Sequence, residues 1–488
     1  MLTSIEESPL FPIANPKSIA FFGASNNIAS MGSNLLASVL ALGYGGAIYP
    51  VHPKETEVQG LKAYGSVSDL PVVPDLAVFV IPTALAVPTL DECGRKGIKS
   101  AIIVTAGFKE VGKEGAAREM ELLEVANRYG IRFLGPNCIG VINTHHKLNT
   151  TFMEHEGSPG FIGMASQSGS FITQMFSYLD RLGLNFSTGF SVGNEATIDI
   201  VDCLEYLGAC PNTKVITLYI EGIRRGRAFM EKARQIVRKK PIVAYYAAGS
   251  ETGKKAGKSH TGAMAGPDPI YQAMFRQCGI ISASSVTELF DMAWLLGTFS
   301  PPSEDGIVIQ THSGGPGTEA ADACGRLGLT LPSLSAETRK GLGELVPHTA
   351  SMNNPVDITY SKDPMHYFNE IPAVLLKDPG CRCFLIYFHM PFQVISRAFR
   401  KMGWTEDMIA TRGRELLMGQ SNIVAGLSER YKKPVVGYTY RGMDDPFIKN
   451  AVKMGMPVFP GPQRAARAIK ALFEYGHIRT KQLGERAA

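Results

Sequence analysis

The chain has 488 residues, of which 45% are hydrophobic and 19% charged, and it contains 51 glycines and 30 prolines. At roughly 150 residues per domain, this length predicts about three domains, each large enough for its own core. Lysine and arginine outnumber aspartate and glutamate by only 49 to 44, whereas a nucleic-acid-binding protein concentrates more positive charge. The apolar content excludes an intrinsically disordered chain.

The N-terminus and the apolar segments argue against an exported or membrane protein. The start of the chain lacks the basic segment that precedes the apolar stretch of a signal peptide. The longest apolar region, 72–90, contains Asp75 and three prolines, but a membrane span needs about 20 nearly uninterrupted apolar residues. The eight cysteines form no CxxC pair, which favours a reducing compartment. We therefore expect a cytoplasmic protein with no membrane or nucleic-acid partner.

Residues 1–150 alternate short β-type runs with helical stretches, and this predicts the first domain. Residues 33–42 and 116–129 carry apolar side chains at helical spacing. Strands that alternate with helices and lack period-2 polarity indicate a parallel sheet covered on both faces. In such sheets ligands bind at the carboxyl ends of the strands. We predict a Rossmann-like domain with strands in the runs 18–25, 46–53, 76–82, 100–107 and 131–137.

The rest of the chain contains an internal repeat, in which 155–300 corresponds to 301–475. Both copies run in the same order: a strand, a glycine-rich turn, a helix, a buried strand, Lys-Lys-Pro with another strand, and a final helix. The pattern predicts two doubly wound, flavodoxin-like domains related by duplication, at 151–300 and 301–488. The expected fold class is therefore α/β throughout.

The two copies differ by an insert between Gly249 and Pro269, which only the first copy contains. Its glycine, serine, threonine and lysine residues cannot build a core, and loops that a scaffold does not require often carry function. The insert contains His260, and Glu221 stands at the end of a strand of the same copy, where it can orient an imidazole that acts as a nucleophile. Taken singly, His260 is better explained as a surface or capping histidine, and Glu221 as a solvated acid at a strand end.

Two glycine-rich turns, one in each copy, follow a strand and open a helix. The first backbone N–H groups of a helix are unpaired, so each turn can hold a phosphate without lysine or arginine. A plain N-cap is the alternative explanation for either turn alone. A phosphorylated histidine would suit a shared site. The candidate phosphate-binding residues are Ser166, Gln167, Ser168, Gly169 and Ser170 in the first turn, and Ser313, Gly314, Gly315 and Gly317 in the second.

The strand ends of the first domain form a candidate nucleotide-binding rim. The first turn lacks the GxGxxG spacing, and Lys54 stands where a site for NAD requires an acid. An NAD-dependent oxidoreductase is therefore disfavoured. Cys138 on the rim suggests a nucleophile, but no histidine is visibly paired with it. The rim residues are Gly23, Ala24, Ser25, Gly32, Lys54, Pro82, Thr105, Ala106, Gly107, Asn137 and Cys138.

Together these motifs resemble those of the NDP-forming acyl-CoA synthetases, the family of succinyl-CoA synthetase and the ADP-forming acetyl-CoA synthetases. The resemblance covers nearly the whole chain and is greatest to the alpha subunit of the latter, which holds a CoA-binding domain and two ligase domains. It is carried by GASNNIASMG, VHPK, VTAGF, GPNCIGVIN, SQSGS, GNEATIDIVDCLEYL, IEG, KSHTGAMAG and HSGGPG.

The resemblance implies a reversible reaction in which acyl-CoA, phosphate and ADP give a carboxylic acid, CoA and ATP. An acyl phosphate would pass its phosphoryl group to His260, with Glu221 as stabilising partner and the two glycine-rich turns as its cradle. The rim of the first domain would hold coenzyme A.

The same resemblance implies that the nucleotide, ADP or ATP, and Mg²⁺ bind mainly to an ATP-grasp module. The chain ends shortly after the third domain, so we expect a separate ATP-grasp beta subunit in a hetero-oligomer of the α2β2 type, and no metal site in this chain. The alternative is a non-catalytic CoA- or acyl-CoA-binding or regulatory protein. The residues do not indicate which acid is used.

Overall fold

The computed structural model describes residues 2, 4–155, 158–247, 249–250, 252, 266–359, 364–389 and 392–484. They form two compact units, one made of Met1–Asp180 and Leu184–Leu289, the other of Arg181–Gly183 and Phe290–Ala488. His260 and most of the insert lie outside the described residues. No helix in the described ranges is both long and apolar enough to cross a membrane.

The first sheet of unit 1 is parallel and has the strand order β2-β1-β5-β6-β7. The helices expected at 33–42 and 116–129 are present as α2 and α4, and the apolar region 72–90 contains the fully buried strand β5 and the start of α3. The elements are η1 (Ile5–Glu7), α1 (Phe11–Ala14), β1 (Ser18–Phe22), α2 (Met31–Ala41), β2 (Ala47–Val51), β3 (Glu57–Val58), β4 (Leu61–Lys62), β5 (Leu76–Phe79), α3 (Thr83–Lys96), β6 (Ser100–Ile103), η2 (Lys109–Val111), α4 (Lys113–Tyr129) and β7 (Arg132–Leu134).

The second sheet of unit 1 has the order β14-β13-β12-β10-β11-β8-β9. Strands β8 and β9, which precede residue 150, extend this sheet through antiparallel pairing. The predicted domain boundary at 150 would assign them to the first domain. The elements are β8 (Val141–Asn143), β9 (Leu148–Asn149), β10 (Ile162–Ser166), α5 (Gly169–Arg181), β11 (Phe186–Ser191), α6 (Ile200–Ala209), β12 (Val215–Ile220), α7 (Gly226–Ile236), β13 (Ile242–Tyr246), α9 (Asp268–Cys278), β14 (Ile281–Ala283) and α10 (Val286–Thr298).

Unit 2 contains one parallel sheet in the order β16-β15-β17-β18-β19. Helix α10 leads into it, and the long helix α18 closes the chain. The elements are β15 (Ile307–Thr311), α11 (Gly314–Arg326), α12 (Ala336–Leu345), β16 (Val356–Asp357), η3 (Pro364–Tyr367), α13 (Glu370–Lys377), β17 (Cys383–Tyr387), α14 (Phe392–Lys401), α15 (Glu406–Met408), the π-helical turn η4 (Ile409–Gly413), α16 (Arg414–Tyr431), β18 (Val435–Thr439), α17 (Pro446–Lys453), β19 (Val458–Pro460) and α18 (Pro462–Gly484).

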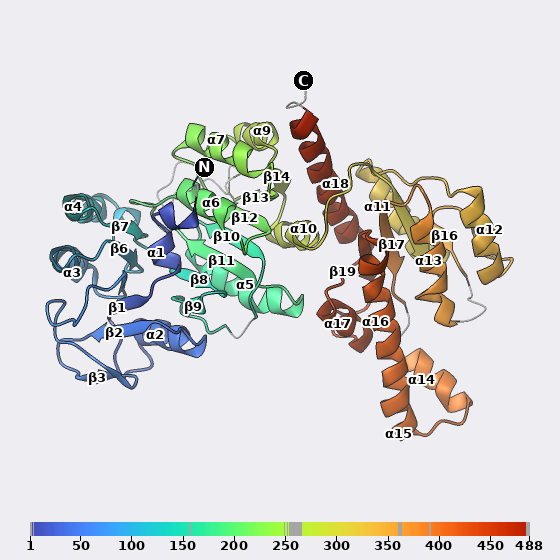
Figure 1. Cartoon of the computed structure of the whole chain (residues 1–488), viewed down its shortest axis with the longest axis horizontal. Coiled ribbons are helices and arrows are strands. Elements are labelled where there is room, and N and C mark those ends of the chain that lie inside the picture. Colours follow the sequence, from blue (N-terminus) through green and yellow to red (C-terminus); the bar gives the residue numbers. More distant parts are fainter. Residues whose placement is uncertain are drawn as a thin grey trace. The chain divides into compact units, whose positions relative to one another are not determined.

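The sheet orders confirm the doubly wound fold and the duplication. Numbered along the chain, the sheet of unit 2 has the order 2-1-3-4-5, and so do strands β10 to β14 of unit 1. This is the order of flavodoxin-like sheets. The parallel strands of the first sheet show the same order, so the chain repeats one βα arrangement three times (Figure 1).

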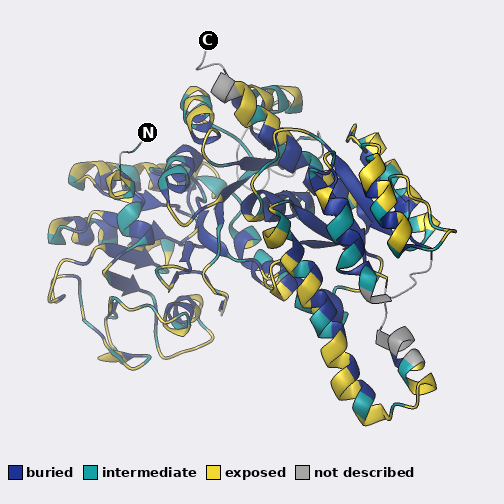
Figure 2. Ribbon diagram, turned by 45° about the vertical axis from the view of Figure 1, so that its right-hand side comes forward, coloured by how far each residue is buried: buried dark blue, intermediate teal, exposed yellow. Residues whose placement is uncertain are grey.

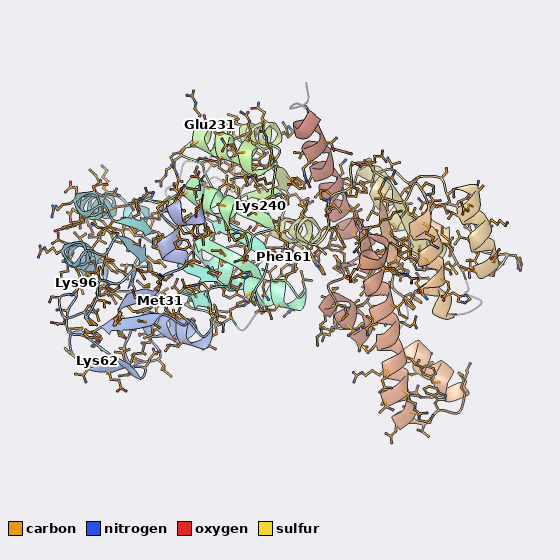
Figure 3. The ribbon with its side chains drawn as sticks, viewed as in Figure 1. Met31, Lys62, Lys96, Phe161, Glu231 and Lys240 are labelled. Carbon is orange, nitrogen blue, oxygen red and sulfur yellow. The ribbon has the colours of Figure 1, made fainter. Side chains whose placement is uncertain are left out.

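The Lys-Lys-Pro motifs have the same structural role in both copies. Lys240 (Figure 3) donates to the carbonyl oxygens of Leu207 and Cys210 at the end of α6. Lys433 donates to Leu376 O at 2.6 Å, at the end of α13. A lysine that caps the last carbonyls of a helix stabilises its C-terminus. The motif therefore marks a shared fold rather than a shared catalytic site.

The core of each unit lies between its sheets and the flanking helices. Strands are buried along most of their length, while the outer helix faces are exposed (Figure 2). Strand β5 is buried at all four positions, as a sheet covered on both faces requires. The carboxyl ends of these buried strands are consequently the places where loops can form a site.

Candidate active site

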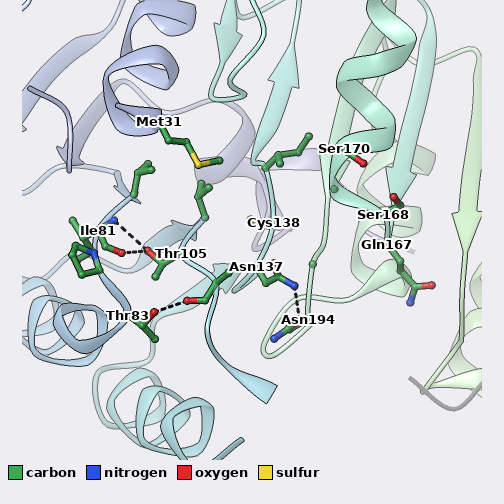
Figure 4. A pocket seen from close by; sticks show the side chains of 17 residues that line it. Met31, Ile81, Thr83, Thr105, Asn137, Cys138, Gln167, Ser168, Ser170 and Asn194 are labelled. Atoms are coloured by element: carbon green, nitrogen blue, oxygen red, sulfur yellow. Dashed lines mark hydrogen bonds between the residues drawn. The ribbon is translucent and has the colours of Figure 1, made fainter. Parts of the chain in front are cut away.

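A cleft of about 560 Å³ lies at the carboxyl ends of the strands in unit 1 (Figure 4). Both sheets of the unit contribute to it, so it lies between the first domain and the first flavodoxin-like domain. Its size is typical of small-molecule sites, which occur at such positions in α/β folds. It is lined by Met31, Val80, Ile81, Pro82, Thr83, Val104, Thr105, Ala106, Asn137, Cys138, Ile139, Gln167, Ser168, Gly169, Ser170, Gly193 and Asn194.

The first-domain side of the cleft is fixed by hydrogen bonds between neighbouring strand ends. Thr105 Oγ1 donates to the carbonyl of Ile81 at 2.8 Å and accepts from its N–H at 3.2 Å. Thr83 Oγ1, in the first turn of α3, donates to the carbonyl of Ala106 at 2.6 Å. These bonds align the loops after β5 and β6 (Figure 4). Five predicted rim residues line the cleft: Pro82, Thr105, Ala106, Asn137 and Cys138.

The other predicted rim residues do not line the cleft. Gly32 has a packing role, because a Cβ at this position would lie 2.1 Å from the carbonyl oxygen of Gly23. Lys54 is exposed in the loop after β2, and Gly107 N donates to Glu110 Oε1 at 2.6 Å. The residues outside the lining are Gly23, Ala24, Ser25, Gly32, Lys54 and Gly107, together with Ser166 of the first glycine-rich turn.

The thiol of Cys138 is poorly suited to nucleophilic attack. The residue is 3% exposed, and burial raises the pKa of its thiol to about 12. Its Sγ lies 3.4 Å from the carbonyl oxygen of Ile103, to which it donates. A protonated, hydrogen-bonded thiol is a weak nucleophile at neutral pH. The structure therefore favours a lining role for Cys138.

The opposite side of the cleft is formed by the first glycine-rich turn. Gln167, Ser168, Gly169 and Ser170 line the cleft where β10 passes into α5. Ser166 is fully buried, and its hydroxyl donates to the carbonyl of Ser168 at 2.7 Å, which shapes the turn. The N-terminus of α5 therefore borders the same cleft as the first-domain rim.

Gln167 connects this turn to Glu221. Its Oε1 accepts from the N–H groups of Glu221 at 2.6 Å and Gly222 at 3.0 Å, and its Nε2 donates to Gly222 O at 2.7 Å. The Glu221 side chain is half-buried. Burial of Tyr219 is the main cause that raises the pKa of its hydroxyl to about 12, and the negative charge of Glu221 raises it further. The amide of Gln167 thus fixes the backbone that carries Glu221.

The described residues that flank the His260 segment lie beside the strand that ends at Glu221. The segment follows β13, which pairs in parallel with β12 so that Tyr246 lies opposite Ile220. At the far end of the segment, Tyr246 Oη donates to Gly266 O at 2.8 Å, and the Tyr246 ring stacks on Tyr271 at 4.0 Å. Both ends of the insert are therefore anchored at the strand beside the one that ends at Glu221.

Gly193 and Asn194 are lining residues that the sequence analysis did not single out. They belong to the loop after β11 and are the first two residues of the GNEAT motif. A Cβ on Gly193 would lie 2.3 Å from Pro136 O, and the residue has a φ of +54°. Only glycine fits such a close approach. The rule that selected the other rim residues, the carboxyl end of a parallel strand, applies equally to this loop.

The lining of the cleft contains no charged side chain among the residues described. An anionic group there would meet backbone N–H groups and the side chains of Asn137, Gln167 and the two serines. Charged groups contact the lining residue Asn194, whose carbonyl oxygen accepts from Lys109 and Arg224 and whose side-chain amide donates to Glu110 and Glu119. The electrostatic attraction of the cleft for an anion therefore comes from helix N-termini and backbone dipoles.

The second glycine-rich turn lies in unit 2, between β15 and α11. Thr311 Oγ1 donates to the carbonyl of Ser313 at 2.9 Å, as Ser166 does to Ser168 in the first copy. Ser313 is the N-cap of α11 and has an extended backbone, and Gly314, Gly315 and Gly317 form the first turn of the helix. The local geometry of the two turns is thus the same.

Three family models match consecutive parts of the chain. A CoA binding domain matches residues 17–144, a succinyl-CoA ligase-like flavodoxin domain matches 159–296, and a ligase-CoA domain matches 307–415. These ranges follow the three sheets in order.

Curated relatives cover nearly the whole chain. The alpha subunit of acetate–CoA ligase (ADP-forming) II from Pyrococcus furiosus is 37% identical over 94% of this chain and 96% of its own length. Acetate–CoA ligase (ADP-forming) I from Archaeoglobus fulgidus is also 37% identical over 96% of this chain, but the chain spans only 64% of that protein.

A solved structure shows the same architecture. It is the acetyl-coenzyme A synthetase 1 of Ca. Korarchaeum cryptofilum in complex with phosphate and ADP, with a TM-score of 0.85 and 32% identity. The match covers 98% of this chain and 99% of that one. Together with the family models and the curated relatives, it shows that the chain belongs to the family of the ADP-forming acetate–CoA ligases.

Proposed function

We propose that the chain is the alpha-type subunit of an ADP-forming acid–CoA ligase, and that His260 carries the phosphoryl group. The reaction would interconvert acyl-CoA, phosphate and ADP with carboxylic acid, CoA and ATP. The observation that carries the proposal is the cleft in which the first-domain rim meets the N-terminus of α5, beside the strand that ends at Glu221. The Pyrococcus furiosus relative supports it, since the match spans almost all of that alpha subunit.

The lining of the cleft fits the arm of coenzyme A, a chain of amides that ends in a thiol. Met31, Ile81, Val104 and Ile139 supply apolar surface, and Asn137 supplies an amide for hydrogen bonding. Acyl transfer to phosphate would take place near the N-terminus of α5, because its unpaired N–H groups favour an anion.

The residues would divide the chemistry as follows. The turn 166–170 would hold phosphate and the acyl phosphate. His260 would accept the phosphoryl group, and Glu221 would orient the imidazole and stabilise its positive charge. The turn 313–317 of unit 2 would serve as the second phosphoryl-binding helix end. The nucleotide and Mg²⁺ would bind to an ATP-grasp beta subunit, in an α2β2 assembly in the cytoplasm.

Phosphoryl labelling of the isolated chain tests this proposal without the partner. The chain is incubated with acetyl-CoA and radiolabelled phosphate, and acid-labile, base-stable label is counted. We expect label on wild type, none on His260→Ala, and full label on His348→Ala, because His348 is an exposed histidine of unit 2. Equal labelling of His260→Ala and wild type would refute the role of His260.

A second assay uses ATP, Mg²⁺ and an ATP-grasp subunit as the phosphoryl source, and should label the same residue. A chain that binds CoA in calorimetry but takes up no label from either source would instead be a CoA-binding protein without catalytic activity. Replacing acetyl-CoA by branched, aryl and dicarboxylic acyl-CoA esters in the first assay then identifies the acid.

A further inference from the structure

Asn194 lines the cleft at the point where the two domains of unit 1 meet. It follows β11 of the second sheet, yet its backbone N–H donates to the carbonyl of Pro136 in the first domain at 2.8 Å. The same loop lies beside the first glycine-rich turn, because the N–H of Val192 donates to the carbonyl of Ser166 at 2.9 Å. Asn194 therefore belongs to the part of the cleft between the first-domain rim and the turn that opens α5 (Figure 4).

Two carboxylates fix the orientation of the Asn194 side-chain amide. Its Nδ2 donates to Glu110 Oε2 at 2.6 Å and to Glu119 Oε2 at 2.9 Å. These bonds use both hydrogens of the NH2 group. The reverse orientation would place the amide oxygen against two carboxylates, which have no hydrogen to donate. The oxygen of the Asn194 amide must therefore face away from these acids.

That oxygen faces the side-chain amide of Asn137, which also lines the cleft. Asn137 Nδ2 donates to Asn194 Oδ1 at 3.4 Å, a distance longer than that of an ordinary N–H···O bond. Among the residues described, neither atom makes another hydrogen bond. An amide nitrogen has two hydrogens and an amide oxygen two lone pairs, so one hydrogen and one lone pair remain for a ligand. The cleft thus presents a donor and an acceptor side by side (Figure 4).

The charged groups that contact Asn194 balance one another. Lys109 from η2 and Arg224 from the loop after β12 donate to its carbonyl oxygen, while Glu110 and Glu119 accept from its amide. These contacts hold the residue firmly, and only 5% of it is exposed. Two cations and two carboxylates add no net charge. The asparagine pair therefore distinguishes ligands by where they carry hydrogen rather than by their charge.

A hydrogenphosphate ion matches a donor and an acceptor that lie side by side. Phosphate keeps at least one proton at neutral pH, so one of its oxygens donates a hydrogen bond while the others accept. Sulfate has the same shape but carries no proton at this pH, and all of its oxygens are acceptors. A sulfate oxygen placed against Asn194 Oδ1 would leave a buried acceptor without a donor, which costs free energy.

We propose that Asn194 is a specificity-determining residue for phosphate, whose Oδ1 accepts the hydrogen of the P–OH group while Asn137 Nδ2 donates to a neighbouring phosphate oxygen. The inference rests on the proposed function, in which phosphate takes up the acyl group in this cleft. Glu110 and Glu119 are positioning residues, because they determine which end of the Asn194 amide faces the ligand. The cleft then selects hydrogenphosphate, and arsenate with the same proton, against sulfate.

The first test measures anion binding to the isolated chain by calorimetry and needs no partner. We expect phosphate and arsenate to bind wild type with similar affinity, and sulfate at least about tenfold more weakly, because a site built to bond a hydroxyl rejects an analogue without it. In Asn194→Ser, which lacks the amide oxygen, the ratio of phosphate to sulfate affinity should fall toward one. A partly unfolded variant still gives this ratio, because both anions are titrated into the same sample.

Two further variants separate the roles of the two asparagines. Asn137→Gly removes the donor and suits the φ of +56° at this position, so both anions should bind more weakly at an unchanged ratio. Asn127→Ala replaces an exposed asparagine of α4 and should bind both anions like wild type. Equal affinity of wild type for phosphate and sulfate, an unchanged ratio in Asn194→Ser, or no binding of phosphate overturns the inference.

The second test examines whether the same selectivity governs phosphoryl labelling. Sulfate is added at increasing concentration to the reaction with acetyl-CoA and radiolabelled phosphate. We expect it to compete weakly in wild type and Asn127→Ala, and about tenfold more strongly relative to phosphate in Asn194→Ser. Equal sensitivity to sulfate in wild type and Asn194→Ser overturns the inference but not the proposed function. If wild type takes up no label, the proposed function fails, and the calorimetric ratio still decides whether Asn194 selects a protonated anion.

Discussion

The imidazole rings of His312 and His389 are in edge-to-face contact, with their centroids 4.6 Å apart. His312 follows β15 as Gln167 follows β10, and His389 and Glu221 each stand three residues beyond an equivalent strand residue, Ile386 or Leu218. The duplicated site of unit 2 therefore has two imidazoles where unit 1 has an amide and a carboxylate.

The neutral state of this pair predicts a pH-dependent stability of unit 2. Burial lowers the pKa of both rings, and the charge of His389 lowers that of His312 further. Below the ordinary histidine pKa of about 6.5, these two side chains therefore bind more protons in the unfolded chain than in the folded one. The contribution of the neutral pair to the free energy of unfolding is therefore fully present above that pH, and it is lost as the pH falls through the lowered pKa of the folded state.

Thermal denaturation between pH 5 and 7.5 measures this effect. We expect the Tm of wild type to fall toward pH 5 more than that of His312→Asn, whose amide does not titrate. His348→Asn replaces an exposed histidine and should follow wild type. If His312→Asn loses as much Tm as wild type, the pair is not the source of the pH dependence.

The roles of Gln167 and Glu221 can be tested separately by a substitution at each residue. Gln167→Ala removes three hydrogen bonds to the backbone at 221–222. At about 1 kcal/mol each, loss of all three in the transition state would slow labelling by about a hundredfold. Glu221→Gln removes the charge but keeps the shape, so labelling should slow while CoA affinity in calorimetry stays the same. A loss of CoA affinity in Glu221→Gln would give this residue a structural role instead.

Thiol reactivity tests the interpretation of Cys138. All eight cysteines are buried and unpaired, and burial raises the pKa of Cys138 to about 12. We expect almost no reaction with Ellman's reagent at pH 8 in the native protein, and eight reacting thiols after denaturation. Cys138→Ala should retain phosphoryl labelling. One rapidly reacting thiol that disappears in Cys138→Ala would restore the nucleophile hypothesis.

The parallel α/β architecture and the order of the three domain types could be predicted because they depend on local patterns that repeat. The βα alternation predicted all three parallel sheets, and the repeated Lys-Lys-Pro predicted the duplication, since Lys240 and Lys433 cap equivalent helices. Strands β8 and β9 have only three and two residues, too short for a periodic pattern, and they were not predicted as members of the second sheet.

The sequence predicted those lining residues of the candidate site whose position depends on a single loop. The strand ends at Thr105 and Asn137 and the turn at Ser168 carry small polar residues at recognisable positions. The loop 193–197, whose Gly193 and Asn194 line the cleft, was missed because it is held by contacts with residues distant in the sequence, such as Lys109 and Glu119. Burial raises the pKa of the neighbouring Glu195 carboxyl to about 7, and no local pattern encodes that burial.

The ion pair between Arg464 and Asp291 links α18 to α10 within unit 2. Arg464 Nε and an NH2 group lie 2.7 Å from the two oxygens of Asp291, whose side chain is 3% exposed. Arg464→Ala leaves this carboxylate buried without its bidentate partner, which typically costs about 3–5 kcal/mol. In urea denaturation, we expect the unfolding midpoint of unit 2 to fall accordingly.

Two further variants separate loss of the pair from loss of a surface charge. Arg326→Ala breaks the exposed pair with Asp322 and should leave the midpoint unchanged, because exposed ion pairs contribute little. The double variant Asp291→Leu with Arg464→Met should recover most of the stability lost in Arg464→Ala, since apolar groups of similar volume leave no buried charge unpaired. If Arg464→Ala unfolds at the wild-type midpoint, the carboxylate of Asp291 is satisfied by other groups, and α10 is held in unit 2 by apolar contacts such as that between Trp294 and Phe459 of β19, whose ring centroids lie 5.4 Å apart.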